Sequence, residues 1–273
     1  MAINFNISEL KLLSKELTEK VGMPFDQMTH SFLKRRLTDV FEKQGFKKKE
    51  QLIDGLKNSL FCDDLRLLFS VHTTELFRDA SFWRYLRKII SERYTNDTLN
   101  IWLPDIASGE ELYSLLILLD ENNILSKTKI VVNHTSAKVL NQVKEGVLLA
   151  RKMDVNAYNY KRFEGADSLD KYYKESYQGF DFNSDLLKDV VFVQGDMLSV
   201  PAEASDIILF RNSMLYYNKE YHVTLKECFD KALKPGGYLC LGVKETLPMP
   251  FEDRFEIIES KEKIYSKYRF LKD

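Results

Sequence analysis

The sequence contains 273 residues, 44% of them apolar and 30% charged, a composition typical of a soluble globular protein with a large core. Its 40 Lys and Arg residues nearly balance 41 Asp and Glu residues, so the whole chain has no net attraction for nucleic acid or an anionic membrane. It contains no apolar run long enough to span a membrane and no signal-peptide pattern, which predicts a cytoplasmic protein without membrane insertion.

The three cysteines give no sign of a disulfide framework or a zinc site. Cys62, Cys228 and Cys240 are too few and too far apart in the sequence for either. We therefore expect buried free thiols and no bound metal.

The first 70 residues carry apolar side chains at helical spacing, which predicts an N-terminal helical domain over residues 1–70. The pattern is clearest in ISELKLLSKELTEKVG, HSFLKRRLTDVFEKQGF, KEQLIDGLKN and DDLRLLFSV, and Ser8 and Asp63 are the expected N-caps. Basic clusters such as LKRRL lie among acidic residues, which favours solvent-exposed helix faces over contacts with nucleic acid.

The remaining residues, 71–273, predict an α/β domain. The stretch SVHTTELFRDASFWRYL places Arg78 between a polar step and an aromatic helical run. After residue 98, short apolar runs alternate with helical patterns, as in LNIWLPDI, EELYSLLILLDENNI, TKIVVNHT and AKVLNQVKEGVL, which predicts a mainly parallel sheet. Residues 151–188 are rich in Tyr, Lys and Asp and show no long periodic helix, so we predict an inserted subdomain there.

Three expected strands end in polar residues. LPDIASGEELYSLLILL runs from a strand through a turn closed by Gly109 into a helix near Glu110, where a ligand can approach the backbone. The acidic residues there attract a cationic ligand or hydroxyl donors, or they only complement the helix dipole. DIILFRNSMLYYNKEY ends in Arg211 and Asn212, and VVFVQGDML ends in Asp196, so each offers either ligand contacts or ordinary turn and cap chemistry.

Taken in order, these pieces resemble the chemotaxis receptor methyltransferases of the CheR family. The chain has TTELFRD where the family has a Thr-rich step before Phe-Phe-Arg-Asp/Glu, and ASGEELYSL where it has Ser-Thr-Gly-Glu-Glu-Pro-Tyr-Ser. The segments FLKRRLTDVF, AKVLNQVKEGVL, VVFVQGDML, ILFRNSMLYYNKE and LKPGGYLCLGVKETL also match family segments, so the resemblance covers nearly the whole chain. It implies a doubly wound, Rossmann-like methyltransferase domain with an N-terminal helical domain and a small inserted β-subdomain.

The resemblance also implies the residues that bind the cofactor, S-adenosylmethionine: His72, Thr74, Arg78, Gly109, Glu110, His134, Asp196, Met197, Asn212 and Ser213. Thr74 and Arg78 are expected at the methionine end and Glu110 at the amino group. Two positions depart from the family pattern, since His72 stands where the family has Asn, and His134 where a strand-end Asp accepts from the ribose hydroxyls.

The implied reaction is methylation of glutamate side chains in the cytoplasmic domains of methyl-accepting chemotaxis receptors, with S-adenosylhomocysteine as the other product. We expect Tyr216 to orient the acceptor carboxylate and Arg78 to pair with the cofactor carboxylate as a bidentate fork. A receptor-facing basic helix is expected to use Lys34, Arg35 and Arg36, and the protein is expected to be a monomer. Two alternatives stay open: a catalytically silent scaffold protein, and methyl transfer to another acceptor.

Overall fold

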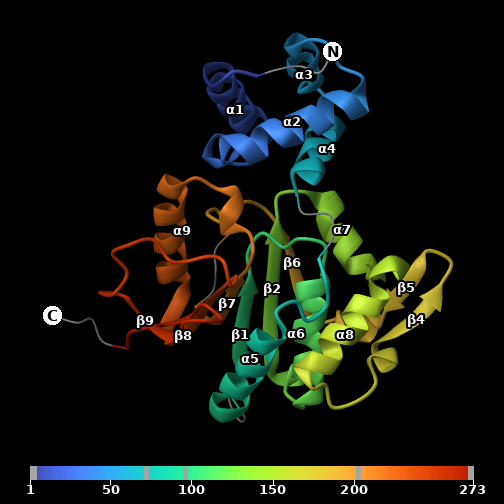
Figure 1. The fold of residues 1–273 in the computed structure, drawn as a ribbon, viewed down its shortest axis with the longest axis vertical. Coiled ribbons are helices and arrows are strands. Elements are labelled where there is room, and N and C mark those ends of the chain that lie inside the picture. Colours follow the sequence, from blue (N-terminus) through green and yellow to red (C-terminus); the bar gives the residue numbers. More distant parts are fainter. Residues whose placement is uncertain (1–4, 71–73, 95–97, 201–203, 270–273) are drawn as a thin grey trace.

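The computed structural model describes residues 5–70, 74–94, 98–200 and 204–269, which form a helical unit stacked on an α/β domain (Figure 1). The helical unit comes first in the chain. Its helices are α1 (Ile7–Val21), α2 (His30–Gln44), α3 (Lys49–Gly55) and α4 (Ser59–Phe69).

The starts of α1 and α4 correct two sequence-based predictions. The Asn6 side chain accepts from the Glu9 N–H while the Glu9 carboxylate accepts from the Asn6 N–H, both at 2.9 Å. This capping box opens α1 before Ser8, so Ser8 is not the cap. Helix α4 begins after Asn58, whose side chain accepts from the Leu60 N–H, and Asp63 lies inside the helix.

The α/β domain is built on a seven-stranded sheet in the order β6-β2-β1-β7-β8-β10-β9. The first five strands pair in parallel, and β10 and β9 add an antiparallel hairpin at one edge. This arrangement confirms the predicted doubly wound α/β fold. The strands are β1 (Leu99–Leu103), β2 (Thr128–His134), β6 (Val190–Gln194), β7 (Ser205–Phe210), β8 (Leu233–Leu241), β9 (Phe255–Glu259) and β10 (Ile264–Lys267).

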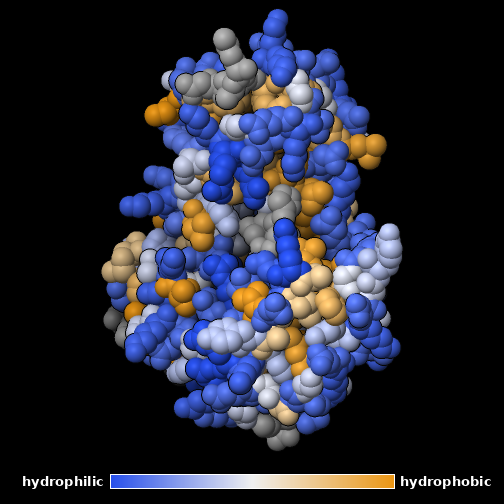
Figure 2. Space-filling view, turned by 45° about the vertical axis from the view of Figure 1, so that its right-hand side comes forward, coloured by the Kyte–Doolittle hydropathy of each residue, from blue (hydrophilic) through white to orange (hydrophobic). Residues whose placement is uncertain are grey.

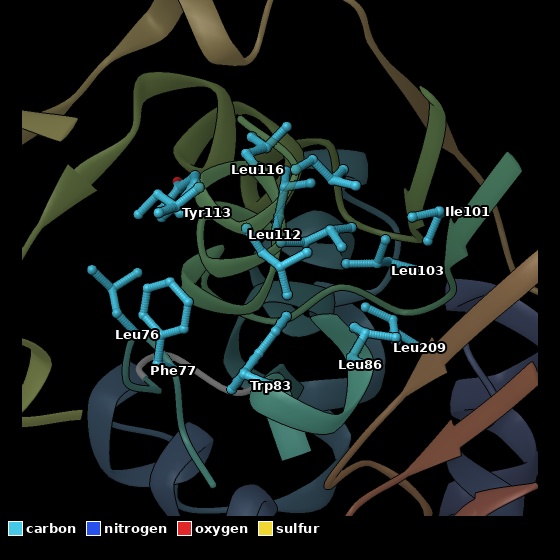
Figure 3. Packing of buried hydrophobic residues seen from close by; sticks show 14 of the residues in the cluster. Leu76, Phe77, Trp83, Leu86, Ile101, Leu103, Leu112, Tyr113, Leu116 and Leu209 are labelled. Atoms are coloured by element: carbon cyan, nitrogen blue, oxygen red, sulfur yellow. The ribbon is translucent and has the colours of Figure 1, made fainter. Parts of the chain in front are cut away.

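Alternate side chains of the central strands enter two different cores. On β1, Ile101 and Leu103 pack with helices α5 (Ala80–Arg93), α6 (Glu110–Glu121) and α7 (Ala137–Glu145), and Figure 3 shows them in one cluster with Leu112 and Leu116 of α6. Trp102 faces the other way, against α9 (Lys219–Ala232). This second core also contains the buried side chains of the N-terminal helices, so one apolar cluster joins the helical unit to the sheet.

Residues 151–188 contain a helix that the sequence analysis missed. Helix α8 (Met153–Phe163) packs on α5, and Phe163 stacks on Phe77 with ring centroids 4.3 Å apart. The helical period was hidden because two of its buried positions are Asn156 and Asn159. The same region contributes to a separate antiparallel sheet, in the order β3 (Val147–Leu148), β5 (Gly179–Phe182) and β4 (Tyr173–Ser176).

The surface is mostly hydrophilic on the face shown in Figure 2, with apolar side chains scattered over both the helical unit and the α/β domain. Leu12 on α1 and Tyr177 between β4 and β5 are among the exposed large apolar side chains. Among the described residues, no helix combines the length and apolar character that a bilayer crossing requires.

Candidate functional site

A cleft lies at the carboxyl end of the parallel strands, beside the end of β1. Open α/β sheets bind their ligands at this place, where the strand order reverses. Six of the predicted site residues line the cleft: Thr74, Arg78, Gly109, Asn212, Ser213 and Tyr216. The structure therefore brings together residues that lie up to 142 positions apart in the sequence, from Thr74 to Tyr216 (216 − 74).

Arg78 lies on an exposed part of the cleft wall, between two residues in left-handed backbone conformations. Phe77 has φ of 50° and Asp79 has φ of 59°. The Phe77 N–H donates to Ser114 Oγ at 2.8 Å, and the Trp83 indole N–H donates to the Arg78 carbonyl at 3.0 Å. These buried neighbours fix the backbone from which the Arg78 side chain extends. The Arg78 guanidinium has no ion-pair partner within the described residues.

The turn before α6 depends on Gly109. Its φ is 103°, and a Cβ at this position would lie 2.5 Å from the Tyr113 hydroxyl oxygen. Next to it, Glu110 is 5% exposed and accepts from Thr74 Oγ at 2.9 Å and from Ser108 Oγ at 2.5 Å. Glu110 thus lies behind the cleft wall and connects the start of α6 to the segment that carries Arg78.

Arg211 forms a buried ion-pair network at the end of β7. Its guanidinium lies 2.9 Å from Asp79 Oδ2 and 3.2 Å from Glu111 Oε1, and it stacks 3.8 Å above the centre of the Phe82 ring. Burial raises the pKa of Glu111, while the positive charge of Arg211 lowers it. These pairs tie the starts of α5 and α6 to the strand end, so Arg211 holds the cleft wall together.

Glu245 is a buried carboxylate that the sequence analysis did not place in the site. It is 5% exposed and accepts from the Asn212 N–H at 2.8 Å and the Gly242 N–H at 2.7 Å. Asn212 has a φ of 61°, and Glu245 holds this strained residue at the cleft. Burial raises the pKa of Glu245, and the N–H donors act in the opposite direction. The sequence feature that could have identified Glu245 is its place at the end of the segment Gly242-Val243-Lys244-Glu245, directly after an expected strand.

His134 lies at the end of β2 in a smaller neighbouring cavity and is 2% exposed. Its Nδ1 accepts from the Ser136 N–H at 2.8 Å, and its Nε2 lies 3.6 Å from Asp105 Oδ1. Burial lowers the pKa of His134, which keeps the ring neutral. The Tyr217 hydroxyl donates to Asp105 Oδ2 at 3.1 Å. Asp105 lines both cavities, although the sequence analysis did not single it out.

The other predicted residues lie outside these two cavities. Met197 is packed in the core, and Asp196 is half-buried, its pKa raised by burial. His72 lies outside the described residues. On α2, Lys34 and Arg35 are exposed, whereas the Arg36 guanidinium donates to the Ser70 carbonyl at 2.9 Å.

The comparisons with known proteins agree with this geometry. The family model described as "CheR methyltransferase, SAM binding domain" matches residues 72–264. The chain belongs to the CheR methyltransferase family. A protein of Pseudomonas putida named as the methyltransferase Cher3 is 25% identical over 265 residues, which cover 95% of this chain and 96% of that protein. A chemotaxis protein methyltransferase of Borreliella burgdorferi is 26% identical, over 90% of each chain.

Among solved structures, the PKMT2 protein of Rickettsia typhi in complex with AdoHcy aligns with a TM-score of 0.37 and 14% identity, over 62% of this chain and 26% of that one. A score this low supports no argument about the site of the CheR-family chain.

The CheR family domain uses S-adenosylmethionine as its cofactor, and the cleft fits this molecule by charge. Exposed Arg78 offers a cation for a carboxylate, while Asp105 and Glu111 offer acceptors for an amine or for hydroxyl groups. Asn212 adds an amide donor and acceptor in the same cleft. The lining residues therefore offer partners of suitable chemistry for the carboxylate, amine and hydroxyl groups of the cofactor.

Proposed function

We propose that this chain transfers a methyl group from S-adenosylmethionine to glutamate side chains of chemotaxis receptor signalling domains and so forms glutamyl methyl esters. The observation that carries the proposal is the contact of Tyr216 in the cleft with Phe32 of α2, whose ring centroids lie 4.5 Å apart. Arg35 and Arg36 lie 5.6 Å and 5.3 Å from the centre of the same Phe32 ring. A basic helix thus adjoins the cleft, which suits an acidic protein segment as the acceptor.

The reaction needs no general base from the protein. A glutamate side chain with a pKa of about 4.3 is already ionised at neutral pH and is itself the nucleophile. S-adenosylmethionine, when bound, supplies an electrophilic methyl group on a sulfonium centre. The protein contributes alignment, which is worth up to about 7 to 11 kcal/mol in well-oriented reactions.

Two of the predicted residues have a proposed task in this alignment. The Arg78 guanidinium pairs with the cofactor carboxylate, and the Tyr216 hydroxyl holds the oxygen of the acceptor carboxylate that does not attack. Hydrogen bonding to the attacking oxygen would slow the reaction, because that oxygen loses charge in the transition state. Thr74, Gly109, Asn212 and Ser213 line the same cleft and are further proposed cofactor contacts. His72, Glu110, His134, Asp196 and Met197 are proposed on the family resemblance alone.

The proposed partners are the cytoplasmic domains of methyl-accepting receptors, met by a cytoplasmic monomer through Lys34, Arg35 and Arg36. The relatives named as chemotaxis protein methyltransferases in Borreliella burgdorferi and Listeria innocua support this proposal. The side chains of Lys34 and Arg35 on α2 are exposed, and a receptor contact through Arg36 would break its hydrogen bond to the Ser70 carbonyl.

Methyl-labelled S-adenosylmethionine tests the proposal directly. Incubation with a receptor signalling fragment should place the label on glutamate, and mild base should release it, since carboxyl esters hydrolyse there and N-methyl groups do not. Tyr216→Phe should lower the transfer rate while cofactor binding is kept. Tight binding of S-adenosylhomocysteine without transfer to any receptor fragment would contradict the proposal and favour a silent scaffold, and a base-stable label would indicate another acceptor.

A further inference from the structure

Three carboxylates line the cleft, and two of them are neutralised by cations within the protein. Glu75 lies 3.2 Å from the Lys152 ammonium, and Glu111 pairs with Arg211. Asp105 differs from both. Within the described part of the chain its contacts are to neutral donors, the Tyr217 hydroxyl and the Nε2 atom of His134. Its negative charge is therefore left for a ligand that donates hydrogen bonds.

The backbone places Asp105 at the centre of the site. Asp105 lies two residues after the end of β1, which is the strand between the two halves of the doubly wound sheet. Its backbone is left-handed, with a φ of 53°. The side chain is 20% exposed and reaches both the main cleft and the smaller cavity. Each carboxylate oxygen has two lone-pair sites. The Tyr217 hydroxyl contacts Oδ2 and His134 Nε2 contacts Oδ1, so each oxygen of Asp105 keeps one site for a further donor.

His134 has no acceptor to offer a hydroxyl group. A neutral imidazole has one acceptor nitrogen, and in His134 this is Nδ1, which already accepts from the Ser136 N–H. The other nitrogen, Nε2, then carries the proton and points it toward Asp105. This tautomer follows from the hydrogen-bond network. At the end of β2 the ring is a donor, and the acceptor beside it is the carboxylate at the end of β1.

We propose that Asp105 binds the vicinal diol of the S-adenosylmethionine ribose, and that Tyr217 and His134 position its carboxylate. A carboxylate with two free lone-pair sites can accept from two adjacent hydroxyl groups at once, as a diol requires. The inference concerns the cofactor and does not depend on the methyl acceptor. Label transfer to a receptor can therefore fail without affecting it, and the reverse also holds.

Titration calorimetry with S-adenosylhomocysteine and its 2′-deoxy analogue tests the assignment. Wild type should prefer the diol by roughly 10-fold to 100-fold, because the lost hydrogen bond is made to a charged group. Asp105→Asn should weaken binding of S-adenosylhomocysteine and lose most of that preference. The proposal is overturned if Asp105→Asn discriminates as well as wild type, or if wild type binds the two ligands equally or binds neither.

Controls separate ligand contact from loss of fold. Asn adopts left-handed backbone readily, so Asp105→Asn should melt near the wild-type temperature, and Asp105→Gly repeats the test without a side chain on the same backbone. Glu75→Gln, which removes another carboxylate from the same cleft, should retain the preference for the diol. An equal loss of preference in Glu75→Gln would show a general charge effect and contradict a specific role for Asp105.

Discussion

Arg78 lies on a short segment whose backbone is constrained on both sides. Left-handed backbone at a non-glycine residue costs of the order of 1 to 3 kcal/mol and persists only where the surroundings fix it. Phe77 and Asp79 both have such backbone, and Ser114, Trp83 and Arg211 supply the hydrogen bonds that hold it. The backbone that positions this arginine is thus strained on both sides, which supports a role of Arg78 in ligand binding.

Replacing Arg78 by alanine should weaken S-adenosylhomocysteine binding by roughly 10-fold to 100-fold, because a charge-assisted pair with the ligand carboxylate is lost. The melting temperature should stay within about 1 °C of wild type, since an exposed side chain contributes little to stability. Calorimetry and thermal melts provide the two measurements. Lys88→Ala, which removes an exposed cation from α5, should bind the ligand normally. Normal binding by Arg78→Ala would contradict its assignment.

The buried neutral His134 should make the protein less stable in mild acid. Its folded pKa lies below the ordinary value of 6.5, so the unfolded chain binds a proton that the folded chain excludes. Stability is therefore complete above pH about 6.5 and falls as pH drops below it, by up to about 1.4 kcal/mol per pH unit for one proton. His134→Asn should flatten this part of a urea-melt pH series. Parallel curves for the two proteins would contradict the prediction.

The residues of the site were predicted unequally well. Gly109, Arg211 and Asn212 follow strand patterns directly, so their place at the carboxyl edge could be predicted from chain order. Asp105 and Glu245 were not singled out, because their importance lies in contacts with distant residues. Glu245 reaches the Asn212 N–H across 33 positions, and Asp105 meets Tyr217 across 112. No local pattern reports such contacts.

Helix α8 links the inserted region to the cofactor cleft. Asn156 Oδ1 accepts from the Leu76 N–H at 2.9 Å, and Asn159 donates to the Leu76 carbonyl at 3.1 Å. Both asparagines are buried. They replace a backbone partner for Leu76, two residues before Arg78, and so fix the direction in which that segment enters the cleft.

Asn156→Ala should therefore affect both stability and binding. It leaves the buried Leu76 N–H without a partner, at a cost of about 1 to 3 kcal/mol in the free energy of unfolding. Well below the melting temperature, S-adenosylhomocysteine should still bind more weakly, because the Arg78 segment is less fixed. Asn183→Ala removes an exposed cap in the same region and should leave ligand affinity unchanged. A purely structural role predicts unchanged affinity in Asn156→Ala as well.

The same helix shows where prediction of elements from sequence ends. The parallel strands were predicted because their apolar runs are short and end in polar or glycine residues. Helix α8 was missed because two inward positions carry amides whose partners lie on another segment. No strand was predicted after residue 245, although β9 and β10 complete the sheet. The sequence of this hairpin resembles that of an exposed loop. What distinguishes it is that β10 is buried between β8 and β9, which only the structure shows.

At the scale of the molecule, the helical unit and the α/β domain share a core. The apolar cluster on one face of the sheet contains Leu37 of α2 and Phe69 of α4 together with Ile208 of β7. Backbone hydrogen bonds cross the same boundary, from the Thr29 N–H to the Tyr216 carbonyl at 2.8 Å and from the Asn218 N–H to the Gln27 carbonyl at 2.7 Å. The wall of the cleft that carries Tyr216 is thus anchored by the N-terminal helices.

This shared core predicts that the two parts unfold together. Leu37 is fully buried, so Leu37→Ala should destabilise the protein by about 2 to 5 kcal/mol. Both tryptophans, Trp83 and Trp102, lie in the α/β domain, so their fluorescence reports only on that domain. Because the core is continuous, the fluorescence melt should shift to lower temperature although the change is made in α2. Leu12→Ala, at a side chain that is 74% exposed, should not shift it. An unshifted tryptophan melt in Leu37→Ala, with loss of helical signal at a lower temperature, would show two independent units.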